Sequence, residues 1–359
     1  MADPHPRLSA RDLLGPSALF LGALLIAVAV AIGPLLGTDL KKVPLDVDQT
    51  WVADGSADTR LLDRCSLEGR RAAVVDGTVS QQRRILTVQP SDSRVVTLQA
   101  GTALGLVGKD ASGDEENSCD EPTLAAAIDR VTLDRRTAAP TGRSQVQYDD
   151  ERAAVPITDR RGYTYLLPFG FDPDDAQYFD PVTRRTLPLR AVGAETMGGR
   201  AVTHFVVDVP DTDLAVAQQD PRAVLTKPAS WFGDLDATAP DEVLTATLHH
   251  RATRDLFVDT VTGVIISERA QITEVYRFVP EVRTRSAALD DFTLTNLSTT
   301  LTSDHQSMRE AADYAAGRAW PVAVATRAVP VAAGVLGTAA LVMGVWWSRR
   351  RPDEAPATD

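Results

Sequence analysis

The chain is poor in the residues and motifs on which most enzymes depend. Its 359 residues include two cysteines and five histidines, and no HExxH, CxxC, GxSxG, Walker or GxGxxG sequence occurs. These patterns mark zinc proteases, dithiol exchange, serine hydrolases and nucleotide binding. We therefore expect a protein that is not an enzyme, with no catalytic residue, no cofactor and no metal ligand.

The histidines and aspartates do not form an obvious metal site. His249 and His250 are adjacent, and in a strand adjacent side chains point to opposite faces, so the two would not chelate one ion. Asp172, Asp174 and Asp175 lack the spacing and the glycine of a calcium-binding loop. We expect structural or surface roles for the histidines and a solvated acidic turn for the aspartates.

Positive charge is also scarce. The 49 acidic side chains outnumber the 37 basic ones, and the formal net charge is -12. A phosphate-rich partner needs clustered lysine and arginine. We therefore expect no nucleic-acid partner.

Two long segments, residues 13–38 and 328–347, contain no ionisable group. At about 1.5 Å of helix per residue, each is long enough to cross a bilayer core of about 30 Å. The first is longer than the apolar region of a cleaved signal peptide, and no A-x-A-like site ends it. We expect two transmembrane helices, packed closely through small residues such as Gly22 and Gly337.

Arginines fix the expected orientation. Three of them, at 349–351, follow the second span, and arginine is enriched on the cytoplasmic side of membranes. With two spans, both termini lie on that side of the plasma membrane. The predicted segments are a cytoplasmic tail at 1–12, a transmembrane helix at 13–38, an extracytoplasmic β-rich domain at 39–327, a transmembrane helix at 328–347 and a cytoplasmic tail at 348–359.

Both cysteines, Cys65 and Cys119, fall in the predicted extracytoplasmic domain. In an oxidising compartment we expect them to form one disulfide, which would stabilise the fold by about 4 kcal/mol in the chain-entropy model. Two unpaired thiols are the alternative, because the sequence does not give the distance between them.

Between the spans, apolar and polar residues alternate with a period of two. Segments such as 84–89, 94–99, 130–134 and 202–209 have the length of strands and are bounded by turn residues. We expect a mainly β ectodomain, an antiparallel sandwich or an irregular barrel with few helices, flanked by two terminal transmembrane α-helices.

Few segments between the spans favour a helix. Residues 124–128 predict one or two turns, and a longer helix is predicted from Ser303, which with Gln306 forms a capping box. Pro321 is expected to break this helix.

Two turns share the sequence D-x-V-T, at 180–183 and 259–262. We expect similar turn chemistry that arose twice, with an internal duplication as the alternative. Gly263 follows the second turn and is expected to supply a positive φ in a hairpin.

A membrane-spanning β-barrel does not fit the predicted strands, which are short, and aromatic residues make up only 6% of the chain. A β domain held at a membrane is suited to bind or carry an apolar molecule. The candidate residues for an apolar ligand wall are Leu166, Leu167, Phe169, Phe171, Trp231 and Phe232. Ordinary core packing is the alternative for these residues.

Residues 165–209 contain a pattern of turn and core positions of the form PF…Y…D…T…P…G.E…G. The matching residues are Pro168, Phe169, Tyr178, Asp180, Thr183, Pro188, Gly193, Glu195, Gly199 and Phe205. This pattern resembles the core of the actinobacterial porin PorA family of unknown function. The resemblance implies the same order of helix, ectodomain and helix, and a porin label.

From these observations we expect a two-pass cell-envelope membrane protein whose extracytoplasmic domain binds or shuttles a lipid or envelope component. A porin or channel component and a structural scaffold of a membrane complex are the alternatives. The expected partners are membrane lipid and other envelope membrane proteins.

Overall fold

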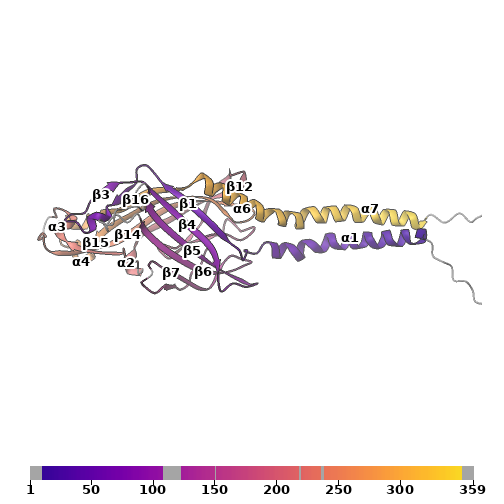
Figure 1. The fold of residues 1–359 in the computed structure, drawn as a ribbon, viewed down its shortest axis with the longest axis horizontal. Helices are drawn as coiled ribbons and strands as arrows, with labels where there is room; N and C mark the ends of the chain where they lie inside the picture. Colours follow the sequence, from indigo (N-terminus) through magenta and orange to yellow (C-terminus); the bar gives the residue numbers. More distant parts are fainter. Residues whose placement is uncertain (1–9, 108–122, 150, 218–219, 236–237, 350–359) are drawn as a thin grey trace, which may run out of the picture. The chain divides into compact units, whose positions relative to one another are not determined.

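The structure is a computed structural model that describes residues 10–107, 123–149, 151–217, 220–235 and 238–349. The chain forms two compact units. One comprises Met1–Lys41 with Gly317–Asp359, and its described residues are helical; the other is a β unit, Lys42–Ala316. Each unit is described by itself below (Figure 1).

The helical unit contains two long apolar helices, α1 (Ala10–Leu40) and α7 (Val329–Arg349). Both α1 and the continuous helical segment His305–Arg349, which includes α7, are long and apolar enough to cross a membrane. The two helices pack against each other through glycines. A Cβ atom at Gly22 would lie 2.8 Å from the carbonyl oxygen of Gly337, and one at Gly337 would lie 3.0 Å from that of Gly22. The backbones therefore approach closely at this point, as the small residues predict.

The helix before α7 differs from the prediction. Helix α6 (His305–Ala323) runs through Pro321 without a break and continues as a π-helix, η2 (Val324–Ala328), into α7. The π-helix lies directly before Pro330, whose ring would clash with the carbonyl group four residues earlier in a regular α-helix. A proline removes one hydrogen bond, and the bonds on either side hold the helix together.

The start of α6 also differs from the prediction. Ser303 is the last residue of a strand, and Asp304 caps the helix by accepting a hydrogen bond from the backbone nitrogen of Ser307 at 2.6 Å. Aspartate is a strong capping residue, and it lies one position closer to the helix than the predicted serine.

The β unit is built around one large sheet. Among the described residues, 14 strands join it, with the main order β11-β12-β14-β15-β16-β1-β4-β5-β6-β7-β8 and every pairing antiparallel. This confirms the predicted fold class of a mainly antiparallel β domain with two long terminal helices. The strands are β1 (Asp48–Gly55), β2 (Arg60–Leu62), β3 (Val74–Asp76), β4 (Val79–Val88), β5 (Val95–Leu106), β6 (Thr123–Asp134), β7 (Pro140–Gln147), β8 (Val155–Ile157), β11 (Arg190–Met197), β12 (Arg200–Asp213), β13 (Val224–Pro228), β14 (Val243–Asp259), β15 (Ile265–Phe278) and β16 (Leu294–Ser303).

Shorter elements complete the unit. A separate two-stranded sheet pairs β9 with β10. The bounds of these elements are η1 (Arg64–Leu67), β9 (Gln177–Asp180), β10 (Arg185–Pro188), α2 (Leu214–Ala217), α3 (Ala229–Phe232), α4 (Pro280–Arg283) and α5 (Ala287–Asp290).

The predicted helical turn at 124–128 is wrong, because these residues belong to β6. Its alanines pair with β5, with Ala127 opposite Thr102 and Ala126 opposite Ala103. Helix propensity is a weak preference, and a neighbouring strand with a full ladder of hydrogen bonds overrides it.

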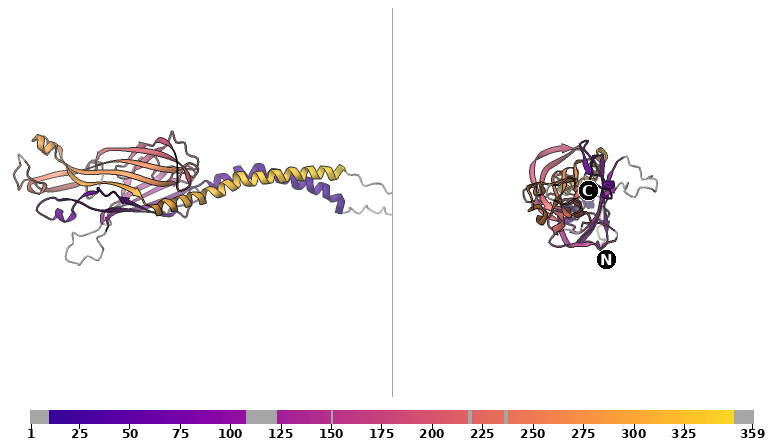
Figure 2. Two further views of the ribbon diagram at one scale, coloured as in Figure 1. Left: turned by 90° about the horizontal axis from the view of Figure 1, so that it is seen from above. Right: turned by 90° about the vertical axis from the view of Figure 1, so that its left-hand side faces the viewer.

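The sheet is curved, so that one of its faces encloses an interior. Residues of β5 and β6 and residues of β14 and β15 line one cavity, although these pairs of strands are far apart in the sheet order. In Figure 2 the later strands, in pink and orange, face the earlier strands, in purple. Alternation with a period of two places every second side chain of each strand in this interior.

Both D-x-V-T turns use the same hydrogen bonds. The carboxylate of Asp180 accepts hydrogen bonds from the backbone nitrogen and the hydroxyl of Thr183, and Asp259 accepts the same pair from Thr262. Gly263 has the expected positive φ, 72°. The shared sequence therefore corresponds to shared turn chemistry, and the internal duplication stays an untested alternative.

Candidate functional site

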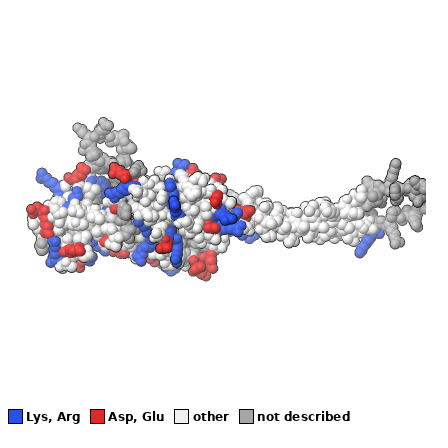
Figure 3. Space-filling model, turned by 90° about the horizontal axis from the view of Figure 1, so that it is seen from below, with Lys and Arg blue, Asp and Glu red and all other residues white. Residues whose placement is uncertain are grey.

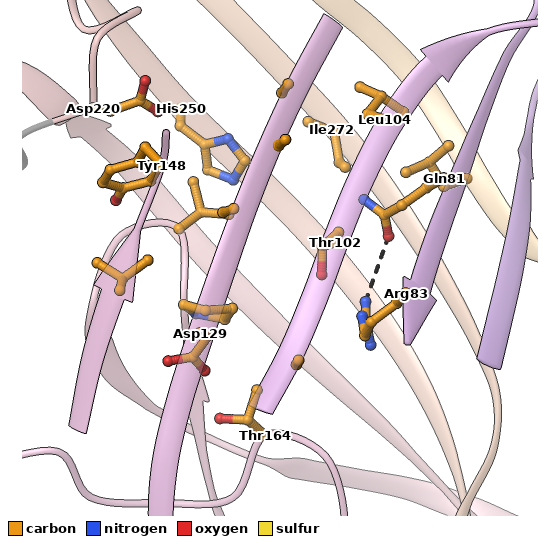
Figure 4. A pocket seen from close by; sticks show the side chains of 18 of the residues that line it. Gln81, Arg83, Thr102, Leu104, Asp129, Tyr148, Thr164, Asp220, His250 and Ile272 are labelled. Atoms are coloured by element: carbon orange, nitrogen blue, oxygen red, sulfur yellow. Dashed lines mark hydrogen bonds between the residues drawn. The ribbon is translucent and has the colours of Figure 1, made fainter. Parts of the chain in front are cut away.

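The interior of the β unit contains a cavity of about 140 Å³. Its lining comes from β4 to β7 on one side, from β14 to β16 on the other, and from loops around β9 and β13 (Figure 4). The lining residues with charged or polar side chains are Gln81, Arg83, Thr102, Asp129, Tyr148, Thr164, Tyr165, Tyr178, Asp220, Arg222, His250, Arg254 and Glu274. Alanine, valine, leucine, isoleucine and proline side chains complete the lining.

Strand alternation explains why these charged side chains point inward. His250 and Arg254 lie four residues apart on β14, so they share a face of the sheet. Glu268 and Glu274 lie six residues apart on β15 and share the same face for the same reason. Figure 4 shows His250, Asp220 and Tyr148 at one end of the cavity and Asp129 and Thr164 at another.

The first cluster of charges is centred on Glu268. Arg83 Nη1 lies 3.2 Å from Glu268 Oε2, and Arg254 Nη1 lies 2.8 Å from Glu268 Oε1. Arg254 Nη2 is also 3.4 Å from Asp180 Oδ1. Burial acts to raise the pKa of Glu268, but the charges of Arg83 and Arg254 outweigh it, and the pKa is lowered. Glu268 is therefore ionised and shared between two arginines.

The second cluster is centred on Glu274. Glu274 Oε1 lies 3.0 Å from Nδ1 of His250, and Glu274 Oε2 accepts a hydrogen bond of 2.6 Å from Asn296. Arg222 Nη1 lies 3.5 Å from Glu274 Oε2, and Arg222 Nη2 lies 2.8 Å from Asp220 Oδ2. Burial alone would raise the pKa of Glu274. Arg222 together with the hydrogen bonds from His250 and Asn296 reverses this and lowers the pKa to about 2.

A third cluster lies around Asp129. Arg160 donates two hydrogen bonds to the carboxylate of Asp129, at 2.7 Å and 2.9 Å, and Tyr165 donates a third. The guanidinium of Arg160 also stacks over the ring of Phe179, at 4.3 Å from its centroid. These contacts fix Asp129 and Tyr165 in the wall of the cavity.

Acid should destabilise the β unit through Glu274. Its folded pKa of about 2 lies below the ordinary value of 4.5, so its contribution to stability is full above pH 4.5 and is lost as the pH falls to about 2. The shift corresponds to about 3 kcal/mol. We expect the urea midpoint of the full-length protein, followed by tryptophan fluorescence, to fall steeply between pH 4.5 and 2. The Glu274→Gln variant should lose much of this pH dependence, and an unchanged slope in that variant would contradict the assignment.

Two buried atoms in the lining have no hydrogen-bond partner among the described residues. They are Nε2 of His250 and Nε of Arg254. His250 is 1% exposed and Arg254 is 6% exposed, so bulk water does not satisfy either atom from the surface. A buried polar atom without a partner is costly, and it is therefore a natural point for a bound molecule to contact.

The arrangement favours binding of a small polar molecule. Each charged side chain of the lining has an oppositely charged partner, so the cavity has both charge balance and fixed geometry. Among the described residues, no group of three or more His, Cys, Asp or Glu side chains is placed to hold a metal ion.

The residues of the predicted apolar wall lie in separate hydrophobic clusters. Leu167 and Phe171 belong to the cluster that contains Phe205, whereas Trp231 and Phe232 belong to the cluster that contains Phe278. Leu166 packs against a third cluster, and Phe169 is half-buried. None of the six lines the cavity, so the structure does not join them into one surface.

The structure does not test the predicted disulfide between Cys65 and Cys119. Cys65 lies in η1, where its backbone nitrogen donates to Asp63. Cys119 lies outside the described residues, so the bond between them stays a prediction.

The sequence analysis missed the charged residues of the cavity. Their only signal in the sequence is parity: His250, Arg254, Glu268 and Glu274 fall at the positions of β14 and β15 that also hold Ala252 and Ile272. A charged residue in register with buried apolar residues indicates an inward side chain, once the strand is known.

Comparison with known proteins identifies a family for this chain. The family described as Porin PorA matches residues 14–346. Among similar proteins, a "Porin PorA" of Corynebacterium amycolatum is 28% identical over 243 residues, which cover 56% of this chain and 58% of that protein. A "Porin PorA" of Corynebacterium resistens is 25% identical over 323 residues, which cover 72% of this chain and 76% of that protein. This chain therefore belongs to the porin PorA family and is a membrane protein.

Proposed function

We propose that this protein is anchored in the cell envelope by its two helices and takes part in the passage of solutes across that envelope. In this proposal its β unit binds a small polar solute in the interior cavity. The observation that carries the proposal is the pair of unpartnered buried atoms, His250 Nε2 and Arg254 Nε, in a lining whose charges are otherwise paired. The family name and the names of both relatives support a role in permeability.

The outer face of the sheet favours a place outside the bilayer. It carries exposed ion pairs, such as Arg84 with Asp48 at 2.8 Å and Arg190 with Asp208 at 3.4 Å. Figure 3 shows acidic and basic side chains spread over the β unit, whereas the described helices α1 and α7 are almost free of them. Charged side chains on a lipid-facing strand are destabilising. The membrane is therefore crossed by the helices in this proposal.

Two closely packed helices leave no aqueous path between them. A permeation path would form between copies of the chain or with other envelope membrane proteins, and the β unit would supply or select the solute. We place the β unit on the extracytoplasmic side of the plasma membrane and both termini in the cytoplasm, as the arginines at 349–351 favour. The proposed role is binding, without catalysis.

The cavity gives no support to the expected lipid ligand. Its volume of about 140 Å³ is close to that of a cavity known to hold one benzene-sized molecule. A long acyl chain would not fit in this volume. Its lining also contains three arginines and three carboxylates. A hydrocarbon chain in the cavity would displace water from these charged groups and offer them no hydrogen bonds in return, which is unfavourable. A small polar solute fits both the size and the polarity of the lining.

A permeability assay tests this proposal. Uptake of small radiolabelled solutes would be compared in the native host, in a strain lacking the gene, and in that strain carrying either the wild type or the Ala127→Leu variant. Ala127 shares the inward face of β6 with Asp129, so the larger side chain should fill part of the cavity. We expect loss of the gene to reduce uptake of at least one solute, and Ala127→Leu to restore little of it.

The matched control is Ala103→Leu. Ala103 lies on the neighbouring strand β5 and is exposed on the outer face, so the same change leaves the cavity intact. This control should restore wild-type uptake. If a normally expressed and folded Ala127→Leu protein restores uptake as well as the control does, the cavity has no role in permeability.

A further inference from the structure

The charges of the cavity lining are already satisfied by the protein. The lining contains Arg83, Arg222 and Arg254 and the carboxylates of Asp129, Asp220 and Glu274. Each of the six forms at least one ion pair, with Asp180, Glu268 and Arg160 as the partners that lie behind the lining. An ion that entered would find no unpaired opposite charge, and it would lose its water without compensation.

The two unpartnered atoms need a partner that can both donate and accept hydrogen bonds. Nδ1 of His250 faces the carboxylate of Glu274, which also accepts from Asn296, so Nδ1 donates to it. Nε2 of His250 has no partner among the described residues, and a hydroxyl group can meet it either as a donor or as an acceptor. Nε of Arg254 carries a hydrogen, and a bound molecule must accept it. A hydroxyl group can fill either role.

The positions of these atoms favour a molecule with several hydroxyls. His250 and Arg254 are four residues apart on one strand, so their side chains reach different parts of the same face. On the neighbouring strand β15, Ile272 lies opposite Ala252, between the positions of His250 and Arg254, and Leu297 and Leu301 of β16 also line the cavity. A short carbon chain or ring with hydroxyls at both ends matches this sequence of polar, apolar and polar contacts.

We infer, on the basis of the proposed function, that the cavity takes up a neutral polyhydroxy solute and discriminates against ions of the same size. The volume of the cavity limits the solute to a molecule of roughly four or five carbons. The paired charges act as fixed dipoles that orient hydroxyls, and they do not act as counter-ions.

The test uses three probes of the same carbon skeleton: erythritol, its acid anion erythronate, and its ammonium analogue 1-amino-1-deoxyerythritol. Binding to the purified full-length protein in detergent would be titrated by ligand-observed NMR at pH 7. We expect saturable binding of erythritol and at least about tenfold weaker binding of both charged probes, which corresponds to about 1.4 kcal/mol. The Ala127→Leu variant should lose erythritol binding, and Ala103→Leu should keep it.

The possible outcomes separate this inference from the proposed function. Binding of a charged probe that equals or exceeds that of erythritol, and that Ala127→Leu abolishes, would overturn the neutral-solute inference and leave the cavity as a binding site. Erythritol binding that Ala127→Leu does not change would place the probe elsewhere and overturn the inference. If no probe binds the wild type, the inference also fails, and the uptake assay then decides the proposed function on its own.

Discussion

Replacing Arg254 with methionine is expected to destabilise the β unit by about 3–5 kcal/mol. Methionine has a similar length but no charge, so Glu268 would keep only Arg83 and Asp180 would lose its ion pair with Arg254. Both carboxylates are buried, and a buried charge without its partner is costly. Urea unfolding of the full-length protein at pH 7 measures the loss.

The pH dependence of this variant distinguishes charge from packing. In the wild type the arginines lower the pKa of Glu268; without Arg254 that pKa should rise, so the variant should take up a proton at higher pH than the wild type does. The stability difference between the two proteins should therefore shrink as the pH falls. The double variant Arg254→Met with Glu268→Gln should recover part of the loss. A difference that is constant with pH, with no recovery in the double variant, would indicate lost packing instead.

Replacing Gly263 with alanine is expected to cost more than about 3 kcal/mol. The backbone of Gly263 has a φ of 72°, which residues with a side chain rarely adopt. A Cβ atom there would also lie 2.2 Å from the carbonyl oxygen of Leu167, whose backbone nitrogen donates to Gly263. The turn and the segment packed on it must therefore separate. Thermal unfolding of the full-length protein measures the effect.

The control for this prediction is Gly170→Ala. Gly170 has a φ of 62°, but a Cβ atom there meets nothing within 4 Å. Its loss should reflect backbone strain alone, about 1–2 kcal/mol. Equal losses at the two glycines would show that the contact with Leu167 does not matter, and the close approach at Gly263 would then be incorrect.

The architecture was readable from the sequence because its signals are long or repeated. Two uncharged runs of 26 and 20 residues predict membrane spans, and many period-two segments predict an antiparallel β domain. Local signals were less reliable. The alanines of 124–128 favour a helix by propensity, yet they pair with β5, and the serine of the predicted capping box lies at the end of β16. In each case the pairing with a neighbouring strand determines the local structure, and the sequence alone does not show which strand that neighbour is.

The candidate site could not be predicted from the sequence, for a related reason. Arg254 and Glu274 look in the sequence like the solvent-facing residues of amphipathic strands, because most charged residues are exposed. Only the curvature of the sheet makes their face an interior, and the curvature depends on pairings between residues more than a hundred positions apart, such as β1 with β16. The apolar segments that seemed the best candidates for a ligand wall pack into cores beside the cavity, which share strands such as β14 and β15 with it, and none of their six residues lines it.

The pairing of the first strand with the last has a practical consequence. Ala53 of β1 lies opposite Ser303 of β16, so the first and the last strand of the sheet are neighbours. The spans α1 and α7 lie outside this range of the chain and contribute no strand. Cutting away both spans would therefore remove no strand and no strand pairing from the sheet. A linker from residue 316 to residue 42 would join a chain whose sheet is already complete. Residues 42–316 are accordingly the natural segment to cyclise, with new ends opened at a hairpin on another edge.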